Sequence, residues 1–373
     1  MPFDSGSVRF RMFYLQKEYD RGVVENFAKR AAPPIDTLDR EPIRGWVTGR
    51  HLLDRDIVEE KCLYGGYLHV QLMQAERKVP ESLLRAYCKL EEEAEMKARD
   101  TTVLPRQVRA EIKARVLEEL TPQMPPTLTG VPTVLDMRNN LLLSAAMSDK
   151  AIDRFAAYFH ETTGETATLV TPETAAVARR QVNVRDLEPT SFSPDPEVPP
   201  PAEVDLGMEF LTWLWHHLET ESPEFELDDG ANYGMMFEGP ASFFGAPLSD
   251  DGDSAGTGAL EAVLRKGAPL ASREAGTALV CGKQLKSVKV TVARDDQLWS
   301  ATLDSQLAFR SLKLPKGEAV DPIGRFEERM SSIEEFWSLV FAIFDSFLEE
   351  RADKAQWGAR VEAIRQWAAA KAS

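Results

Sequence analysis

Prolines at positions 80, 105 and 122 bracket two stretches that contain neither glycine nor proline. A proline is well tolerated where a helix begins, because its missing N–H has no partner there, and it ends a helix that reaches it. The sequence therefore predicts helices over 81–100 and 106–120. Each has one face on which apolar residues recur at three- and four-residue steps, formed by Leu83, Tyr87, Leu90 and Ala94 in the first and by Val108, Ile112, Val116 and Leu120 in the second.

Strand patterns lie on both sides of this helix pair. Apolar and polar residues alternate over Val8–Tyr14, and two short apolar runs, 133–136 and 141–145, flank a turn at Asn139-Asn140. Alternation over 288–314 predicts an antiparallel meander, followed by a long phenylalanine-rich helix over 325–351. We also expect a short helix over 260–264 and a loop over 249–258. This order of elements favours an α+β fold with mixed or antiparallel sheets and long helices.

The net charge of −16 is concentrated in one segment. Residues 186–264 contain no Lys or Arg but 18 of the 60 acidic residues, so the remaining 42 nearly balance the 44 basic residues elsewhere. The rest of the chain can therefore present a basic face. Binding of duplex DNA without sequence preference needs only such a face, directed at phosphates.

Composition divides the chain into three regions. Residues 1–190 form an N-terminal α+β region with the helix pair, 191–258 a proline-rich acidic insertion with a tryptophan-rich helix, and 259–373 the meander and the C-terminal helices. The three cysteines are unclustered, which predicts neither a disulfide framework nor a zinc site. The longest apolar run is too short to cross a bilayer, and no secretory signal is evident. We expect a cytoplasmic protein without a cofactor.

On the second helix, Arg106, Arg109 and Lys113 fall within about 60° of one another at 3.6 residues per turn. Flexible cations at this spacing suit contacts with phosphates. The alternative interpretation is an ordinary solvated helix face, because Glu111, Glu118 and Glu119 lie nearby.

Several short motifs follow one another along the chain: Gly45-Trp46-Val47, Lys78-Val79-Pro80, Glu111-Ile112-Lys113, Leu120-Thr121-Pro122, Asp136 in its strand, Ser148 before a helix and Gly282-Lys283. Taken in this order, they resemble the family of the recombination-associated protein RdgC, a bacterial DNA-binding family. The resemblance covers most of residues 8–185 and returns over about 259–350. The chain departs from the family pattern in the acidic insertion and in the tail past Glu350.

The resemblance implies a homodimer of horseshoe-shaped subunits that closes a ring around duplex DNA at the nucleoid and restrains a recombinase. The family often places a large apolar residue just after the L-x-P turn, where two subunits meet, and Met124 stands there in this chain. Basic residues from several elements would line the ring. The candidates on the helix pair and the meander are Lys97, Arg99, Arg106, Arg109, Lys113, Arg115, Lys283, Lys286, Arg310 and Lys313.

Two other functions stay open. An acidic insertion suits a protein-interaction module that holds a basic partner and binds little DNA. The third candidate is a metal-dependent exonuclease, a label that the family has carried, since Glu111-Ile112-Lys113 fits the E-x-K part of a nuclease signature. This motif lies on a predicted helix, and no Pro-Asp precedes it at a strand end, so we expect no enzymatic activity.

Overall fold

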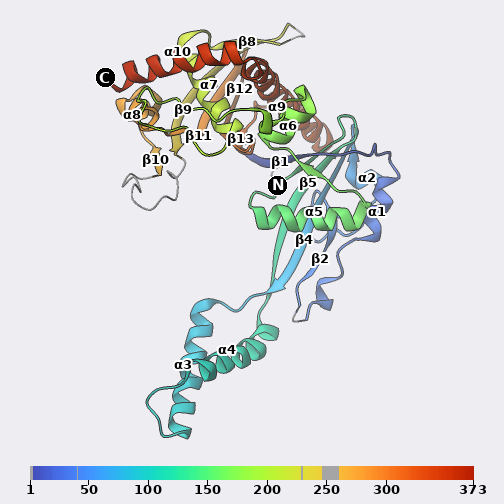
Figure 1. Ribbon diagram of the computed structural model, residues 1–373. Coiled ribbons are helices and arrows are strands. Elements are labelled where there is room, and N and C mark those ends of the chain that lie inside the picture. The colour runs from blue at the N-terminus through green and yellow to red at the C-terminus, as the bar shows by residue number, and fades with distance from the viewer. Residues whose placement is uncertain (1–2, 40, 228–229, 246–259) are drawn as a thin grey trace. The chain divides into compact units, whose positions relative to one another are not determined.

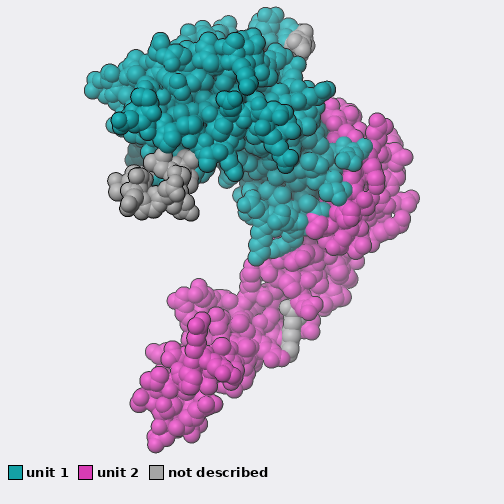
Figure 2. Space-filling view, in the orientation of Figure 1, with its two compact units in different colours: residues 1–16, 141–156, 166–373 teal, residues 17–140, 157–165 magenta. Residues whose placement is uncertain are grey.

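The computed structural model describes residues 3–39, 41–227, 230–245 and 260–373, so the loop predicted over 249–258 lies outside the described residues. The chain divides into two compact units (Figure 2). Unit 1 contains residues 1–16, 141–156 and 166–373, and unit 2 contains residues 17–140 and 157–165. Helix α5 (Asp149–Thr163) contributes residues to both units. The fold is α+β, as expected, and the division by composition into three regions stays a prediction.

Unit 2 is built on an antiparallel sheet in which β4 (Tyr67–Arg77) lies between β2 (Ile43–Thr48) and β5 (Pro126–Asp136). The short strand β3 (Leu63–Tyr64) also pairs with β4. β4 and β5 stay in register from Tyr67 opposite Asp136 to Arg77 opposite Pro126. Their long ladder forms the base from which the predicted helix pair extends.

Both faces of the unit 2 sheet are covered. On one face, Trp46 is fully buried, packs edge-on against Phe27 of α1 (Val23–Lys29) at 4.7 Å, and donates from Nε1 to Thr162 Oγ1 at 2.8 Å. The remaining short elements of the unit are η1 (Ile35–Thr37) and α2 (Glu59–Cys62). A second cluster of buried residues contains Ala32, Leu38, Val47, Met73 and Ala75.

The helices α3 (Glu81–Ala98) and α4 (Arg106–Leu120) form a hairpin inserted between β4 and β5, beyond the paired strand ends (Figure 1). The turn η2 (Thr121–Gln123) leads back to β5. The predicted buried stripe of α4 is confirmed, with Ile112, Val116 and Leu120 all buried. The apolar face expected on α3 is wrong in part, because Tyr87 and Leu90 are 44% and 62% exposed. Of the expected face, Leu83 does pack against the α4 stripe, together with Leu84, Cys88 and Met96.

Unit 1 contains a larger antiparallel sheet with the strand order β10-β9-β11-β12-β13-β1-β6. Two short strands extend it, since β8 pairs with β9 and β7 pairs with β1. The predicted meander and the first predicted strand are confirmed. The short helix expected over 260–264 is wrong: these residues form strand β10, which pairs with Ala241–Phe244 of β9. The strands are β1 (Val8–Tyr14), β6 (Leu141–Ser144), β7 (Thr168–Leu169), β8 (Glu224–Glu226), β9 (Asn232–Phe244), β10 (Glu261–Leu264), β11 (Gln284–Arg294), β12 (Gln297–Asp304) and β13 (Phe309–Lys313).

Long helices cover one face of this sheet. The tryptophan-rich helix α7 (Leu206–Thr220) packs on β11, where Leu285 N donates to Thr212 Oγ1 at 3.0 Å. Trp299 of β12 donates from Nε1 to Ser332 O of α9 (Pro322–Ala352) at 3.0 Å. The other helical elements of the unit are α6 (Pro172–Arg180), η3 (Val184–Asp186), η4 (Pro269–Ala271), α8 (Arg273–Val280) and α10 (Lys354–Ala372).

Carboxylates of the acidic segment 186–264 pair with cations of α9 and α10. Glu209 and Arg351 lie 2.7 Å apart, Glu219 and Lys371 2.6 Å, and Glu188 and Lys354 3.5 Å. Glu221 binds Arg360. The C-terminal helices therefore neutralise part of the charge that the composition concentrates in this segment.

Candidate nucleic-acid interface

The hairpin of α3 and α4 depends on the two prolines that precede its helices. Pro80 and Pro105 are the N-cap residues, both with extended backbone (ψ 136° and 151°), so each helix begins at the next residue. At the base, the guanidinium of Arg77, the last residue of β4, donates to the carbonyl of Met124. This contact ties the end of the hairpin to the strand from which it departs.

The basic side of α4 is exposed, as predicted for Arg106, Arg109 and Lys113. Within the part of the chain that the structure describes, Arg106 and Lys113 belong to no ion pair, and neither does Lys97 near the end of α3. The Nε of Arg109 donates to Leu104 O at 3.2 Å, across the loop between the helices. These cations keep their charge available to solvent.

The other two predicted cations of the hairpin are held by carboxylates. Arg99 lies 2.6 Å from Glu95 on the same helix, and Arg115 lies 2.6 Å from Glu91 of α3. Arg115 is also about 160° around α4 from Lys113. The structure therefore separates Arg115 from the basic side of α4.

The predicted cations of the meander lie in unit 1 and form a different surface. Lys286 is 3.8 Å from Glu261 and lies over the ring of Phe244 at 4.5 Å. Arg310 is 3.0 Å from Asp304. Among the described residues, neither Lys283, which is half-buried, nor Lys313, which is exposed, takes part in an ion pair.

One cation near this surface was not predicted. Arg11 of β1 is only 6% exposed, its Nε has no hydrogen-bond partner, and burial lowers the pKa of its guanidinium, against the opposing effect of Asp304. Simple alternation along Val8–Tyr14 would place this side chain in solvent. The sequence carries no local signal for it, because its burial depends on other strands and helices of unit 1.

Met124, the residue expected at a contact between subunits, is half-buried and lies between η2 and β5. Its carbonyl binds Arg77, as described above, so the backbone here is fixed. The position of Met124 is consistent with a surface contact at the base of the hairpin, and its role in dimerisation stays a prediction.

The E-x-K motif lacks the geometry of a nuclease site. Glu111 and Lys113 are two positions apart on α4, so their side chains diverge by about 160°. Ile112 between them is buried, and the Glu111 carboxylate accepts from Gln107 Nε2 at 3.2 Å. Across the described residues, no three His, Cys, Asp or Glu side chains are grouped to hold a metal ion.

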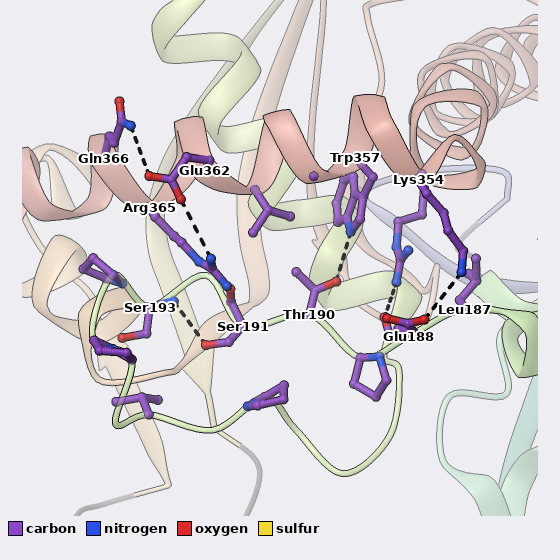
Figure 3. A pocket seen from close by; sticks show the side chains of 18 of the residues that line it. Leu187, Glu188, Thr190, Ser191, Ser193, Lys354, Trp357, Glu362, Arg365 and Gln366 are labelled. Atoms are coloured by element: carbon purple, nitrogen blue, oxygen red, sulfur yellow. Dashed lines mark hydrogen bonds and ion pairs between the residues drawn. The ribbon is translucent and has the colours of Figure 1, made fainter.

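A pocket of about 760 Å³ lies between α10 and the connector 186–200 in unit 1 (Figure 3). Its polar groups bind one another: Trp357 Nε1 donates to Thr190 Oγ1 at 3.0 Å, and Arg365 donates to Ser191 O at 3.0 Å. Prolines of the connector supply much of the remaining wall. These hydrogen bonds hold the connector against α10. None of the predicted site residues lines the pocket.

Comparison with known proteins supports one assignment. A family model described as "Putative exonuclease, RdgC" matches residues 11–181, a range that contains the whole hairpin and ends before the acidic segment and the meander. No curated protein matches the chain. No described helix is long and apolar enough to cross a membrane. The resemblance noted in the sequence is thus confirmed over residues 11–181, which are similar to the RdgC family.

Proposed function

We propose that this protein binds double-stranded DNA without sequence preference, through contacts between phosphates and the cations of the α3–α4 hairpin. The observation that carries the proposal is the exposed side of α4 with Arg106 and Lys113, cations that no carboxylate of the described chain neutralises. A cation without a fixed partner has no ion pair to break when it binds a phosphate. The proposed contacts on the hairpin are Lys97, Arg99, Arg106, Arg109, Lys113 and Arg115.

The family resemblance extends this proposal to assembly and role. We propose a homodimer that encloses duplex DNA, with Met124 at a contact between subunits, and that limits the access of a recombinase to DNA. Lys283, Lys286, Arg310 and Lys313 are the proposed contacts on the meander. Support for this second set is weaker, because Lys286 and Arg310 already pair with carboxylates.

Fluorescence anisotropy with labelled duplexes of unrelated sequence tests the proposal. The wild-type protein is expected to bind all duplexes alike and to lose affinity steeply as salt rises, because phosphate contacts release counterions. Replacing Arg106, Arg109 and Lys113 together by Ala should weaken binding to every duplex and lower the salt slope by about 2.7, that is about 0.9 per contact. Circular dichroism verifies that the helices remain.

The double variant Arg99→Ala/Arg115→Ala is the matched control. It removes two cations from the same hairpin, but both are ion-paired in the free protein, with Glu95 and Glu91. Its effect per residue is expected to be smaller than that of the triple variant. Equal binding by the wild type and the triple variant would exclude α4 as the contact surface, and absence of salt-dependent binding would exclude the function.

The acidic segment is a less favourable surface for a basic partner than its composition indicates. Glu209, Glu219 and Glu221 are ion-paired with the C-terminal helices and are not free to hold another protein. The exonuclease alternative has no geometric support at Glu111 and Lys113, whose side chains diverge on α4. We therefore favour DNA binding over both alternatives.

A further inference from the structure

We infer that Glu238 and Glu261 compete with DNA phosphate on the open face of the unit 1 sheet. There Glu238 forms an ion pair with Lys289, and Glu261 forms one with Lys286. This inference rests on the proposed function and concerns its regulation. The open face is the one opposite α7 and α9. It is a second phosphate-binding surface on which Lys286 and Lys289 become available only when these two carboxylates are displaced.

The register of the strands places the relevant side chains in rows across this face. In one row Lys289 of β11 stands between Glu238 of β9 and Thr302 of β12, and Thr302 stands opposite Arg310 of β13. Directly opposed residues of an antiparallel pair point to the same face. A neighbouring row contains Val263, Ser242, Ser287 and Asp304, and the next contains Met236, Thr291, Ser300 and Lys313.

Hydroxyl groups occupy the middle of this face. The Oγ atoms of Ser242 and Ser287 lie 2.7 Å apart, beside a hollow of about 450 Å³. Serine and threonine hydroxyls donate to phosphate oxygens in the same way as basic side chains, although without charge. The hollow is lined by Pro240, Ala241, Ser242, Val263, Arg265, Ser287 and Thr302. A face of hydroxyls flanked by cations fits a phosphodiester backbone.

The carboxylates hold the lysines of this face without burying them. The Glu238 carboxylate binds the Lys289 ammonium, with side chains 35% and 37% exposed. Glu261 and Lys286 are 3.8 Å apart and 52% and 43% exposed. Ion pairs at this exposure are individually weak, so a phosphate can replace the carboxylate at little cost. The hydrogen bond from Lys289 also holds the pKa of Glu238 below its usual range, so the competitor is charged at neutral pH.

Both competitors lie in the segment 186–264, which contains no Lys or Arg. A carboxylate that has left its lysine remains close to the bound backbone and repels it. Glu238 and Glu261 therefore weaken binding at this face most strongly at low salt, where repulsion is least screened. This predicts a gain of DNA affinity when the two carboxylates are made neutral.

The experiment measures duplex binding by the full-length double variant Glu238→Gln/Glu261→Gln over a series of salt concentrations. Each substitution is expected to tighten binding by roughly threefold, in line with the worth of an exposed ion pair. The salt slope should become steeper by about 0.9 for each lysine that is freed. Adding Lys289→Ala to the Glu238→Gln variant should abolish the gain from that substitution, which a general loss of negative charge would not predict.

Glu224→Gln/Glu226→Gln is the control, because these two exposed carboxylates lie on β8 in the same acidic segment and make the same change in net charge. An equal gain in this control overturns the inference. Salt-dependent binding by the wild type with no gain in Glu238→Gln/Glu261→Gln also overturns it and leaves the proposed function intact. If neither protein binds at low salt, the proposed function itself fails.

Discussion

Glu209 and Arg351 join α7 to α9 through an ion pair of 2.7 Å in which the two side chains are only 1% and 5% exposed. Arg351 also donates from Nη2 to Glu188 O at 2.7 Å, so the guanidinium connects the connector to both helices. The substitution Arg351→Ala leaves the Glu209 carboxylate buried without its partner. Loss of one member of a buried pair costs about 3–5 kcal/mol.

We therefore expect that Arg351→Ala unfolds at a much lower urea concentration than the wild type. Tryptophan fluorescence measures the unfolding midpoint. Lys354→Ala is the matched control, because it removes the pair between Lys354 and Glu188, whose side chains are 84% and 87% exposed. That exposed pair should contribute almost nothing to the free energy of unfolding. Similar midpoints for the two variants would contradict the assigned role of the buried pair.

The α3–α4 hairpin has a small core of its own, centred on Ile112. Ile112→Ala is expected to cost roughly 2–4 kcal/mol, near the usual range for a buried isoleucine. Because the cluster belongs to the hairpin, hydrogen exchange should accelerate over 81–120 more than in the sheet of unit 2. Leu90→Ala, on the exposed side of α3, should leave exchange unchanged, and uniform acceleration through both units would refute a separate hairpin core.

Gly45 is required because the chain segment at Ala32 passes directly over it. A Cβ added at Gly45 would lie 2.2 Å from Ala32 Cα, where Ala32 N donates to Trp46 O at 2.8 Å. The added Cβ would clash with backbone atoms, which cannot move aside as a flexible side chain can. Gly45→Ala should therefore destabilise unit 2 by more than about 3 kcal/mol. Gly358→Ala provides the contrast, since its Cβ would meet nothing within 4 Å and alanine favours a helix by about 0.5–1 kcal/mol. In thermal unfolding, Gly45→Ala should lower the melting temperature and Gly358→Ala should raise it.

The buried His69 on β4 is expected to make the stability of the protein sensitive to acid. Its ring is 1% exposed, and burial lowers its pKa to about 3 from the ordinary 6.5. Below pH 6.5 the unfolded chain binds a proton that the folded chain does not, so the free energy of unfolding falls as pH drops from about 6.5 towards 3, by on the order of a few kcal/mol.

The substitution His69→Phe keeps a ring in this position and removes the proton site. Its urea midpoint should depend less on pH between 6.5 and 4 than that of the wild type. His51→Gln is the control, since His51 is exposed and should give the wild-type profile. Parallel profiles for wild type and His69→Phe would show that His69 does not cause the acid sensitivity.

The spacing of apolar residues along the chain was enough to predict helices and strands whose buried face follows one regular repeat. Val116 and Leu120 follow the helical repeat and are buried, and the alternation over Val8–Tyr14 is a strand. The exposed position of Leu90 could not be read from the same repeat, because the buried side of α3 depends on where α4 lies. Residues 260–264 are equally compatible with a short helix or a strand, and the neighbouring β9 decides for a strand.

The electrostatic part of the candidate site was the least predictable. Lysines on the meander were identified as cations, but Lys289 and Glu238 are 51 residues apart in the chain and meet only through the register of β9 and β11. Arg11 is buried among other strands and helices although its place in the alternation indicates solvent. Pairing of charges depends on tertiary structure, so composition overstated how many cations of the meander are free.

The ion pairs between the acidic segment and the last helix also have an evolutionary consequence. Glu219 and Glu221 are neutralised by Lys371 and Arg360 of α10, and both partners lie outside the family match at 11–181. A lineage that lost α10 would leave these carboxylates uncompensated against α7. We expect the two segments to be inherited as a pair, so that homologues with the negative insertion also carry the terminal helix and those without one lack the other.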